Sequence, residues 1–595
     1  MAARVALLMD QPWWQKAVLY QVYLRSFADS NGDGVGDLRG VIDKLDYLDW
    51  LGVDALWLSP VTVSPDKDWG YDVSDYRDVQ PVFGSLDDVD ELIVEARERG
   101  MRIVLDLVPN HTSDRHPWFA DARASRTARY RDWYLWADPR PDGSPPNNWR
   151  AAFGGGPAWE PTPETGQMYL HSFLPEQVDL DWWNENVRNE FDDVMRFWLD
   201  RGIAGFRLDV AHAIVKDREL RDVPNDYDKG VLVDIDETFA VLRRWRGVVD
   251  TYEEARILLG ETWVMDLERL ARFYGTGTDQ LHLAFNFPYT FAPLEAAALR
   301  DVVEGTRAVF PPEAWPVWML SNHDIPRFPT RTCGGDERKI RCALLALLTL
   351  RGTAVLYQGD EIGLEQVDVP LDRRRDVEVE GRDGCRTPMP WTSDGGWSDP
   401  WLPLGETTRN VEDERADPKS ILNFVRDVIA LRRSNADFQS GSYEPLEAPD
   451  SVWAYRRGDS TVVLNLSDEP RAYEGTTLAG SPTARRPRSS PCAGGSARAP
   501  RRPRRRDPRL RRRSRCRRPS ARGRRTSGAR PPTEASARRR DRARRRSGRR
   551  TRARTASRAP APGRPRTASR ARSAARRGAS RWPCSPRARR RAARP

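Results

Sequence analysis

The sequence predicts an α/β protein built on a (β/α)8 TIM barrel. Eight short segments are mostly apolar on both faces, as strands buried in a parallel sheet are, and amphipathic helical segments separate them. Eight such units favour a barrel over a doubly wound sheet. The predicted strands are Ala17–Phe27, Ala55–Pro60, Arg102–Pro109, Gly205–Ala211, Ile257–Trp263, Leu281–Phe287, Val317–Asp324 and Ala354–Gly363.

Helical periodicity between the strands completes the barrel, which we assign to residues 1–109 and 182–435. The clearest helices are predicted at Leu86–Arg99, Arg188–Arg201, Glu337–Leu350 and Asp417–Asn435. Residues 110–181, rich in Pro, Gly, Trp and Asn, follow the third strand and are too long for an ordinary loop. We therefore expect an inserted domain at this place.

A small β domain is expected after the barrel, over residues 436–480. Residues 452–468 alternate between apolar and polar side chains around a turn at Gly458-Asp459, which is typical of a hairpin. Apolar strands are not found beyond residue 480, so the sequence predicts a truncated C-terminal β-sandwich.

Residues 481–595 form an arginine- and proline-rich tail with 44 Arg, no Lys and three acidic residues. Its only large apolar side chains are Leu510 and Trp582, which cannot offset the entropy of folding, so we expect disorder. One interpretation is a tail that binds nucleic acid. Arginine without lysine, starting abruptly, instead favours a frame-shifted or non-native segment of a GC-rich gene, with no specific nucleic-acid partner.

The basic isoelectric point belongs to the tail, because residues 1–480 carry a formal charge of −30. No run of 18 apolar residues is present, and the N-terminal run Val5–Met9 is too short for a secretory signal. The cysteines of residues 1–480 (Cys333, Cys342 and Cys385) form no CxxC motif. We expect a cytoplasmic monomer or weak homo-oligomer with no membrane partner.

Charged side chains gather where the predicted strands end. Active-site residues of such barrels come from the carboxyl ends of strands. Three acids on one rim, with Arg and His between them, suggest glycoside chemistry, in which one carboxylate attacks and another protonates the leaving oxygen. Arg207 lies two residues before Asp209 on the same face and should hold that acid ionised. The three acids are Asp209, Glu261 and Asp324, and the same rim also carries Asp106, His111, Arg207 and His323.

At these positions the chain resembles the α-amylase family, glycoside hydrolase family 13, and within it the α-glucosidase and oligo-1,6-glucosidase branch. Four segments are similar to the signature regions of the family, and three others to its auxiliary regions, all in the family's order. The first four are DLVPNHTS (106–113), GFRLDVAH (205–212), LGETW (259–263) and SNHDIPR (321–327). The others are GVDALWLSPV (52–61), QVDLDWWN (177–184) and GDEIGL (359–364).

The resemblance implies a role for each matching residue. Asp209 matches the nucleophile, Glu261 the general acid/base and Asp324 the transition-state stabiliser. The residues that match sugar-binding positions are His111, Arg207, His323, Asp68, Tyr71, Arg382 and Arg386. The last two arginines, in GRDGCRTPMPW, resemble the family's arginines near the terminal sugar, which favours an exo-acting pocket.

The loop DSNGDGVGD (29–37) begins like an EF-hand but has Gly40 where that motif requires Glu, so an EF-hand is rejected. In the family that the chain resembles, this loop binds one structural calcium ion. Alternating oxygen donors suit such a hard cation. The expected ligands are Asp29, Asn31, Asp33, the Val35 carbonyl and Asp37, and the alternative is an acidic turn without an ion.

We therefore expect a retaining exo-acting α-glucosidase that hydrolyses short oligosaccharides and has no organic cofactor. The alternatives are an oligo-1,6-glucosidase, or a transglycosylase or isomerase that acts on sucrose or maltose. Val210, after the nucleophile, resembles α-1,6-acting members of the family. The continuation Ala211-His212-Ala213 resembles bacterial α-glucosidases that prefer short α-1,4 substrates, so maltose is expected to be preferred.

Overall fold

The computed structural model describes residues 11–223, 235–377 and 381–471. Three predictions concern residues outside these ranges. They are the disorder of residues 481–595, the origin of that tail in a shifted frame, and the truncation of the C-terminal sandwich.

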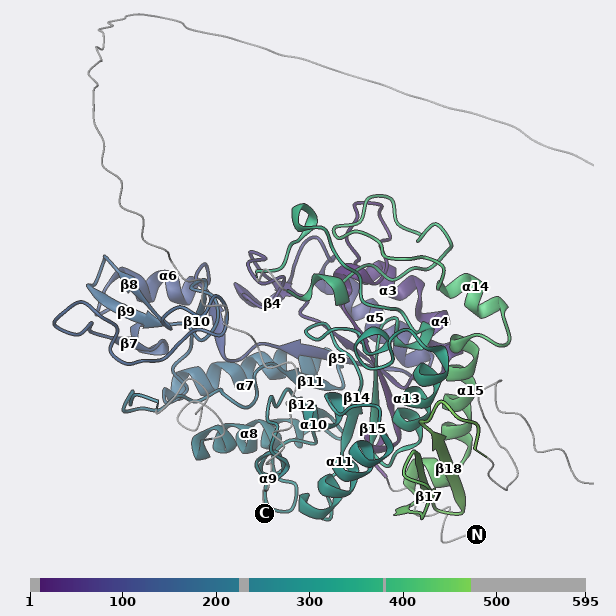
Figure 1. Ribbon diagram of the computed structural model, residues 1–595. Helices are drawn as coiled ribbons and strands as arrows, with labels where there is room; N and C mark the ends of the chain where they lie inside the picture. The colour runs from purple at the N-terminus through teal and green to yellow at the C-terminus, as the bar shows by residue number, and fades with distance from the viewer. Residues whose placement is uncertain (1–10, 224–234, 378–380, 472–595) are drawn as a thin grey trace, which may run out of the picture. The chain divides into compact units, whose positions relative to one another are not determined.

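Eight parallel strands form one sheet in the order β13-β12-β11-β5-β2-β1-β15-β14 (Figure 1). A parallel bridge between Phe285 and Val317 joins the two outer strands, so the sheet is nearly closed into the predicted barrel. The strands are β1 (Val18–Val22), β2 (Ala55–Leu58), β5 (Arg102–Leu107), β11 (Gly205–Leu208), β12 (Ile257–Gly260), β13 (Leu283–Ala284), β14 (Val317–Met319) and β15 (Thr353–Tyr357).

All eight predicted strands are present, but each ends two to six residues earlier than the apolar pattern suggests. The side chains of β1, β2, β11 and β12 are all buried, which explains their continuous apolar runs. Beyond the last paired residue, the chain turns into loops. As a result Asp209, Glu261 and Asp324 follow the strands instead of lying within them.

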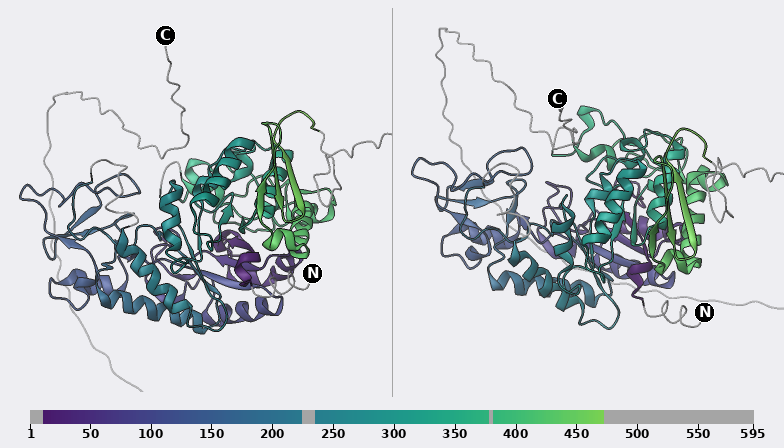
Figure 2. Two further views of the ribbon diagram at one scale, coloured as in Figure 1. Left: turned by 90° about the horizontal axis from the view of Figure 1, so that it is seen from below. Right: turned by 60° about the horizontal axis from the view of Figure 1, so that its bottom comes forward.

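Helices follow most strands and cover the barrel (Figures 1 and 2). The four predicted helices are confirmed, and their buried faces carry the apolar side chains, such as Val89 and Leu92 in α5. Ser85 begins that helix with a capping box to Asp88. The larger helices are α5 (Leu86–Glu98), α7 (Glu185–Asp200), α8 (Asp236–Val249), α11 (Ala296–Val309), α13 (Glu337–Thr349) and α15 (Ile421–Ser434).

The segment between β5 and α7 folds into small antiparallel sheets of its own. β6 (His111–Ser113) pairs with β10 (Gln177–Asp179), and β9 (Gln167–Leu170) lies between β7 (Trp136–Ala137) and β8 (Trp159–Thr162). A separate apolar cluster, formed by Trp149, Ala158, Trp159, Met168 and Leu170, stabilises this part. Both ends of the segment return to the barrel rim, so its first and last strands can contribute side chains there.

A three-stranded antiparallel sheet follows α15 and α16 (Ala436–Ser440). It consists of β16 (Tyr443–Pro445), β17 (Val452–Arg457) and β18 (Ser460–Asn465), and its hairpin turns at the predicted Gly458-Asp459. Trp453 and Tyr455 are fully buried, and the Tyr455 hydroxyl bonds to Thr349 of α13. The sheet therefore packs against the barrel helices (Figure 2).

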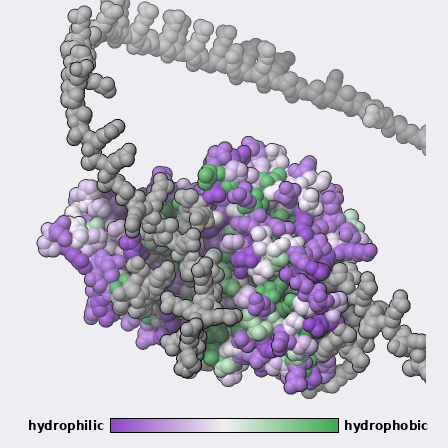
Figure 3. All heavy atoms as spheres, viewed as in Figure 1, coloured by the Kyte–Doolittle hydropathy of each residue, from purple (hydrophilic) through white to green (hydrophobic). Residues whose placement is uncertain are grey.

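Among the described residues, no helix combines the length and the apolar character needed to cross a bilayer. The face shown in Figure 3 is mainly hydrophilic, with apolar residues scattered in small groups. The three cysteines of residues 1–480 are free thiols, and Cys333 and Cys385 are buried.

Candidate active site

Arg207 is the centre of the candidate site. It lies in β11 opposite Asp106 of β5, and its side chain is fully buried. Its Nη1 atom lies 2.8 Å from Asp106 Oδ1 and 2.8 Å from Asp209 Oδ1, and its Nη2 atom lies 2.7 Å from Glu261 Oε2. One guanidinium group thus holds carboxylates from three neighbouring strand ends.

The backbone of β11 explains how these groups approach one another. Gly205 has φ +143°, and a Cβ atom there would lie 2.1 Å from the carbonyl oxygen of Ile257, so only glycine allows β11 and β12 to pair so closely. Val210, next to Asp209, has φ +48°, which is strained for a β-branched residue. That conformation directs the Val210 N–H to Glu261 Oε2 at 3.0 Å.

The carboxylates outnumber the positive charge around Arg207. Burial raises the pKa of Asp106 to about 6, although Arg207 acts in the opposite direction. Burial also raises the pKa of Asp209 well above its ordinary value, and Glu261 adds to this rise while Arg207 opposes it. The sequence predicts that Arg207 holds Asp209 ionised. Arg207 does contact Asp209 and lower its pKa, but burial and the neighbouring acids raise that pKa by more.

Asp324, after β14, has a different environment. Its Oδ1 atom accepts hydrogen bonds from Arg386 Nη2 at 2.9 Å and Arg382 Nη1 at 3.2 Å, and its Oδ2 atom lies 3.1 Å from His323 Nε2. Burial would raise the pKa of Asp324, but His323, Arg386 and Arg382 outweigh it and hold that pKa well below its usual range. Asp324 is therefore ionised at neutral pH.

His323 is fixed between aromatic rings. It stacks on Tyr71 with ring centroids 5.3 Å apart, and on Tyr23 at 5.5 Å. Its Nδ1 atom lies 2.7 Å from Gln21 Nε2, and its Nε2 atom lies 2.6 Å from the Tyr71 hydroxyl. Burial lowers the pKa of His323 well below its ordinary value, although the neighbouring Asp324 acts in the opposite direction.

Asp68 and His111 complete the polar lining. Asp68 Oδ1 accepts a hydrogen bond from Arg382 Nη2 at 2.6 Å, and Asp68 Oδ2 accepts one from Gln177 Nε2 at 3.2 Å. The same Gln177 nitrogen lies 3.1 Å from His111 Nε2, while the Tyr71 hydroxyl donates to Asp106 Oδ2 at 3.0 Å. Gln177 belongs to β10, so the inserted segment closes one side of the site.

These contacts join all ten predicted catalytic and substrate-binding residues in one network. The structure adds residues to which the sequence assigned no role: Asp106, Gln177 and Asp376. Gln177 lies in QVDLDWWN, one of the segments that resemble the family, so that motif was a usable signal. Asp376 lies in no such segment; it contacts Arg382, six positions later, and the fold brings both to Asp68.

A second buried charge connects the inserted segment to the loop after β11. Lys216 Nζ lies 3.1 Å from Asp179 Oδ2 and donates to Asn110 Oδ1 at 2.5 Å, and both Lys216 and Asp179 are buried. Asn110 Nδ2 in turn lies 3.0 Å from His111 Nδ1. This contact stabilises the position of His111.

The five expected calcium ligands lie on one loop away from this network. Asp29 Oδ1 accepts hydrogen bonds from the N–H groups of Asn31 and Gly32 at 3.1 and 2.7 Å, and Asp33 Oδ1 accepts one from Val35 at 2.9 Å. In the described part of the chain, no three Asp, Glu, His or Cys side chains are grouped as a metal site. The donor set consists entirely of oxygen atoms and fits a hard cation in its chemistry.

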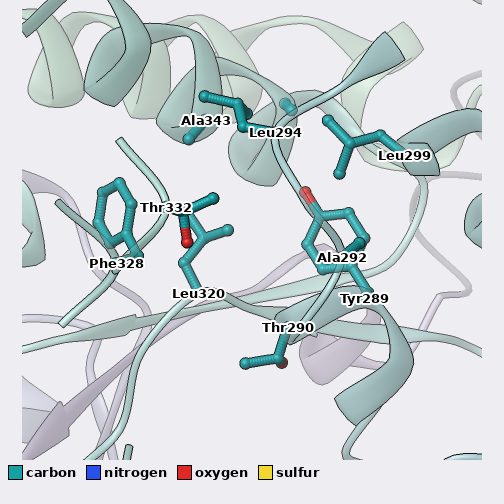
Figure 4. A pocket seen from close by; sticks show the side chains of 10 residues that line it. Tyr289, Thr290, Ala292, Leu294, Leu299, Leu320, Phe328, Thr332 and Ala343 are labelled. Carbon is teal, nitrogen blue, oxygen red and sulfur yellow. The ribbon is translucent and has the colours of Figure 1, made fainter. Parts of the chain in front are cut away.

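An apolar pocket lies elsewhere in the barrel wall (Figure 4). Side chains from α10 (Phe287–Thr290), α11, α12 (Phe328–Arg331) and α13 line it, together with Leu320 after β14. None of its lining residues belongs to the Arg207 network, and it contains no acid. It is therefore not a candidate for the catalytic chemistry.

A barrel whose carboxyl rim joins three strand-end acids through Arg and His side chains defines a glycoside hydrolase. The family model "Alpha amylase, catalytic domain" matches residues 21–441. The chain belongs to the α-amylase family, glycoside hydrolase family 13.

Individual relatives cover most of the chain. A "Probable alpha-glucosidase" of Rhizobium meliloti (strain 1021) is 41% identical over an alignment of 515 positions, which covers 78% of this chain and 91% of that protein. An "Oligo-1,6-glucosidase" of Heyndrickxia coagulans is 36% identical over 524 residues, with coverages of 78% and 93%. The solved structure of an alpha-glucosyl transfer enzyme, XgtA, is 40% identical with a TM-score of 0.73, and covers 78% of this chain and 92% of its own.

Proposed function

We propose that the protein is a retaining, exo-acting α-glucosidase that releases glucose from the non-reducing end of short α-glucosides. The observation that carries the proposal is the pair of linked networks at the rim. Arg207 holds Asp209 beside Glu261, and Arg382 holds Asp68 beside Asp324. The first network supplies two carboxyl groups for double displacement, and the second supplies donors and acceptors for a terminal sugar.

In the first step, Asp209 attacks the anomeric carbon and Glu261 donates a proton to the leaving glycosidic oxygen. The productive state has Asp209 ionised and Glu261 protonated. Both acids contact Arg207, which therefore holds their carboxyl groups next to one another. The Val210 N–H and Arg207 Nη2 both contact Glu261 Oε2, so the other carboxyl oxygen is the one that carries the proton.

In the second step, Glu261 accepts a proton from water, which attacks the glucosyl–Asp209 ester and releases glucose. Asp324 stays ionised between Arg382, Arg386 and His323, and its charge stabilises the oxocarbenium-like transition state. Two displacements restore the α-anomeric configuration.

A second candidate function uses the same covalent intermediate. A sugar hydroxyl in place of water would make the protein a transglycosylase, or an isomerase acting on sucrose or maltose. The similarity to an alpha-glucosyl transfer enzyme favours keeping this alternative. An α-1,6-specific hydrolase is a further alternative, since one relative is an oligo-1,6-glucosidase.

Separating the products formed from maltose, isomaltose and sucrose distinguishes these functions. We expect mainly glucose, with a higher kcat/KM on maltose than on isomaltose, and α-glucose as the first product in NMR spectra. Products larger than the substrate, or rearranged disaccharides, would instead support transfer or isomerisation. Fresh β-glucose would contradict the retaining mechanism.

The 29–37 loop is proposed to bind one structural calcium ion through Asp29, Asn31, Asp33, the Val35 carbonyl and Asp37. The loop packs closely against the backbone at Asp399, and only glycine fits at position 34. A Cβ atom there would lie 1.9 Å from the carbonyl oxygen of Asp399. Calcium added to EDTA-treated protein should raise Tm, since a ligand at about 100 times its Kd stabilises by about 2.7 kcal/mol.

Asp33→Ala should abolish this rise in Tm, whereas Asp46→Ala, a control at a side chain that is 87% exposed, should leave it unchanged. Equal Tm values in calcium and EDTA would contradict the proposed site.

The free thiols of Cys333, Cys342 and Cys385 further support a proposed cytoplasmic location. A monomer or weak homo-oligomer is proposed for the solution state.

A further inference from the structure

Arg382 lies between three carboxylates, two of which face the proposed sugar site. Its Nη2 atom donates to Asp68 at 2.6 Å, and its Nη1 atom donates to Asp324 at 3.2 Å. The third carboxylate, Asp376, lies 2.7 Å from Nη2 and 3.1–3.2 Å from Nε. The side chain of Asp376 is only 1% exposed, whereas that of Asp324 is 18% exposed.

Asp376 makes more bonds to Arg382 than either of the other acids. Both of its oxygens accept from Nε, one accepts from Nη2, and one also accepts from the backbone N–H of Arg382. It therefore fixes the rotation of the guanidinium plane, so that Nη1 and Nη2 can reach Asp324 and Asp68. Burial would raise the pKa of Asp376, but Arg382 lowers it to about 2, and the pair is fully charged at neutral pH.

The backbone around Asp376 is itself anchored. Asp383, which is buried in the turn after Arg382, accepts hydrogen bonds from the N–H groups of Arg375 at 2.7 Å and Asp376 at 3.1 Å. The carbonyl of Arg375 accepts a bond from the indole of Trp69, the neighbour of Asp68. Asp376 is thus held against the same loop that presents Asp68.

We propose that Asp376 is a positioning residue for the terminal sugar: it orients Arg382 so that Asp68 and Asp324 are presented together to the glucose unit. This inference rests on the proposed function, because it assigns Arg382 and Asp68 to binding of a terminal glucose. The side chain of Asp376 is only 1% exposed, so we assign it an action through Arg382 and no direct contact with the sugar.

Asp376→Asn keeps the shape of the side chain but removes its charge, so Arg382 should turn toward the two remaining acids. We expect KM for maltose and Ki for glucose to rise at least tenfold, while kcat falls less than threefold. Asp376→Glu, which keeps the charge on a longer side chain, should lie between wild type and Asp376→Asn. Asp368→Asn is the matched control on the same loop. The Asp368 side chain is 99% exposed, and its Oδ1 atom lies 3.6 Å from Arg374 Nη2.

Calorimetric binding of glucose to the full chain separates this inference from the proposed function. Absence of glucose binding by wild type would overturn the proposed function. Equal glucose affinity of wild type and folded Asp376→Asn, or a loss confined to kcat, would overturn the positioning role. Where Asp376→Asn fails to fold, Asp383→Ala, which frees the Asp376 N–H, must raise KM and Ki, and unchanged constants would overturn the role.

Discussion

Asp209→Asn is expected to lower kcat by about four orders of magnitude or more while the protein remains folded. Loss of the nucleophile blocks the covalent intermediate, and an amide oxygen is a far weaker nucleophile than a carboxylate. The assay is steady-state hydrolysis of maltose, with circular dichroism as the check of folding. Substantial activity in the folded variant would show that Asp209 is not the nucleophile.

The same substitution, which lowers activity, should raise the free energy of unfolding at alkaline pH. Since burial raises the pKa of Asp209 in the fold, ionising it costs stability as pH rises above the ordinary value of the group. Asp209→Asn removes this cost, so the variant should be more stable than wild type near pH 8, and the two should converge near pH 4. Urea unfolding at both pH values measures this difference, and Asp193→Asn, at a carboxylate that is 68% exposed, is the control.

Arg207→Gln is expected to lower the free energy of unfolding by about 3–5 kcal/mol at pH 7, because it leaves buried carboxylates without their cation. Activity should be lost together with the stability. Arg207→Lys keeps a positive charge but cannot reach all three acids, so its loss of stability should be smaller.

The stability loss of Arg207→Gln should depend on pH. Arg207 lowers the pKa values of Asp106 and Asp209, so its removal raises both further above their unfolded values. A raised native pKa means that stability is lost as pH rises through it, so the deficit should be small near pH 4.5 and grow toward pH 8. Urea midpoints across this range test the sign, and a deficit that shrinks with rising pH would contradict it.

The barrel was predictable from local sequence, because short continuous apolar segments such as those around Leu56 and Phe206 alternate with amphipathic helical ones, as strands buried on both faces do in such folds. It also predicted that Asp209, Glu261 and Asp324 lie at the ends of such segments, and the structure places all three there. These are local patterns, in which a few neighbouring side chains define a strand and its end. The hairpin at Gly458-Asp459 was predictable for the same reason.

The pKa shifts at the site and the partners of each acid depend on the folded structure. The sequence suggested that Arg207 pairs with Asp209, but in the fold it also pairs with Asp106 and Glu261. Because the site is desolvated, burial raises the pKa of Asp209 by more than Arg207 lowers it. The sequence did not indicate a role for Asp376. That role depends on the contact between Arg382 and Asp68, which are more than 300 positions apart in the chain. Desolvation and long-range contacts arise from packing, which no local pattern specifies.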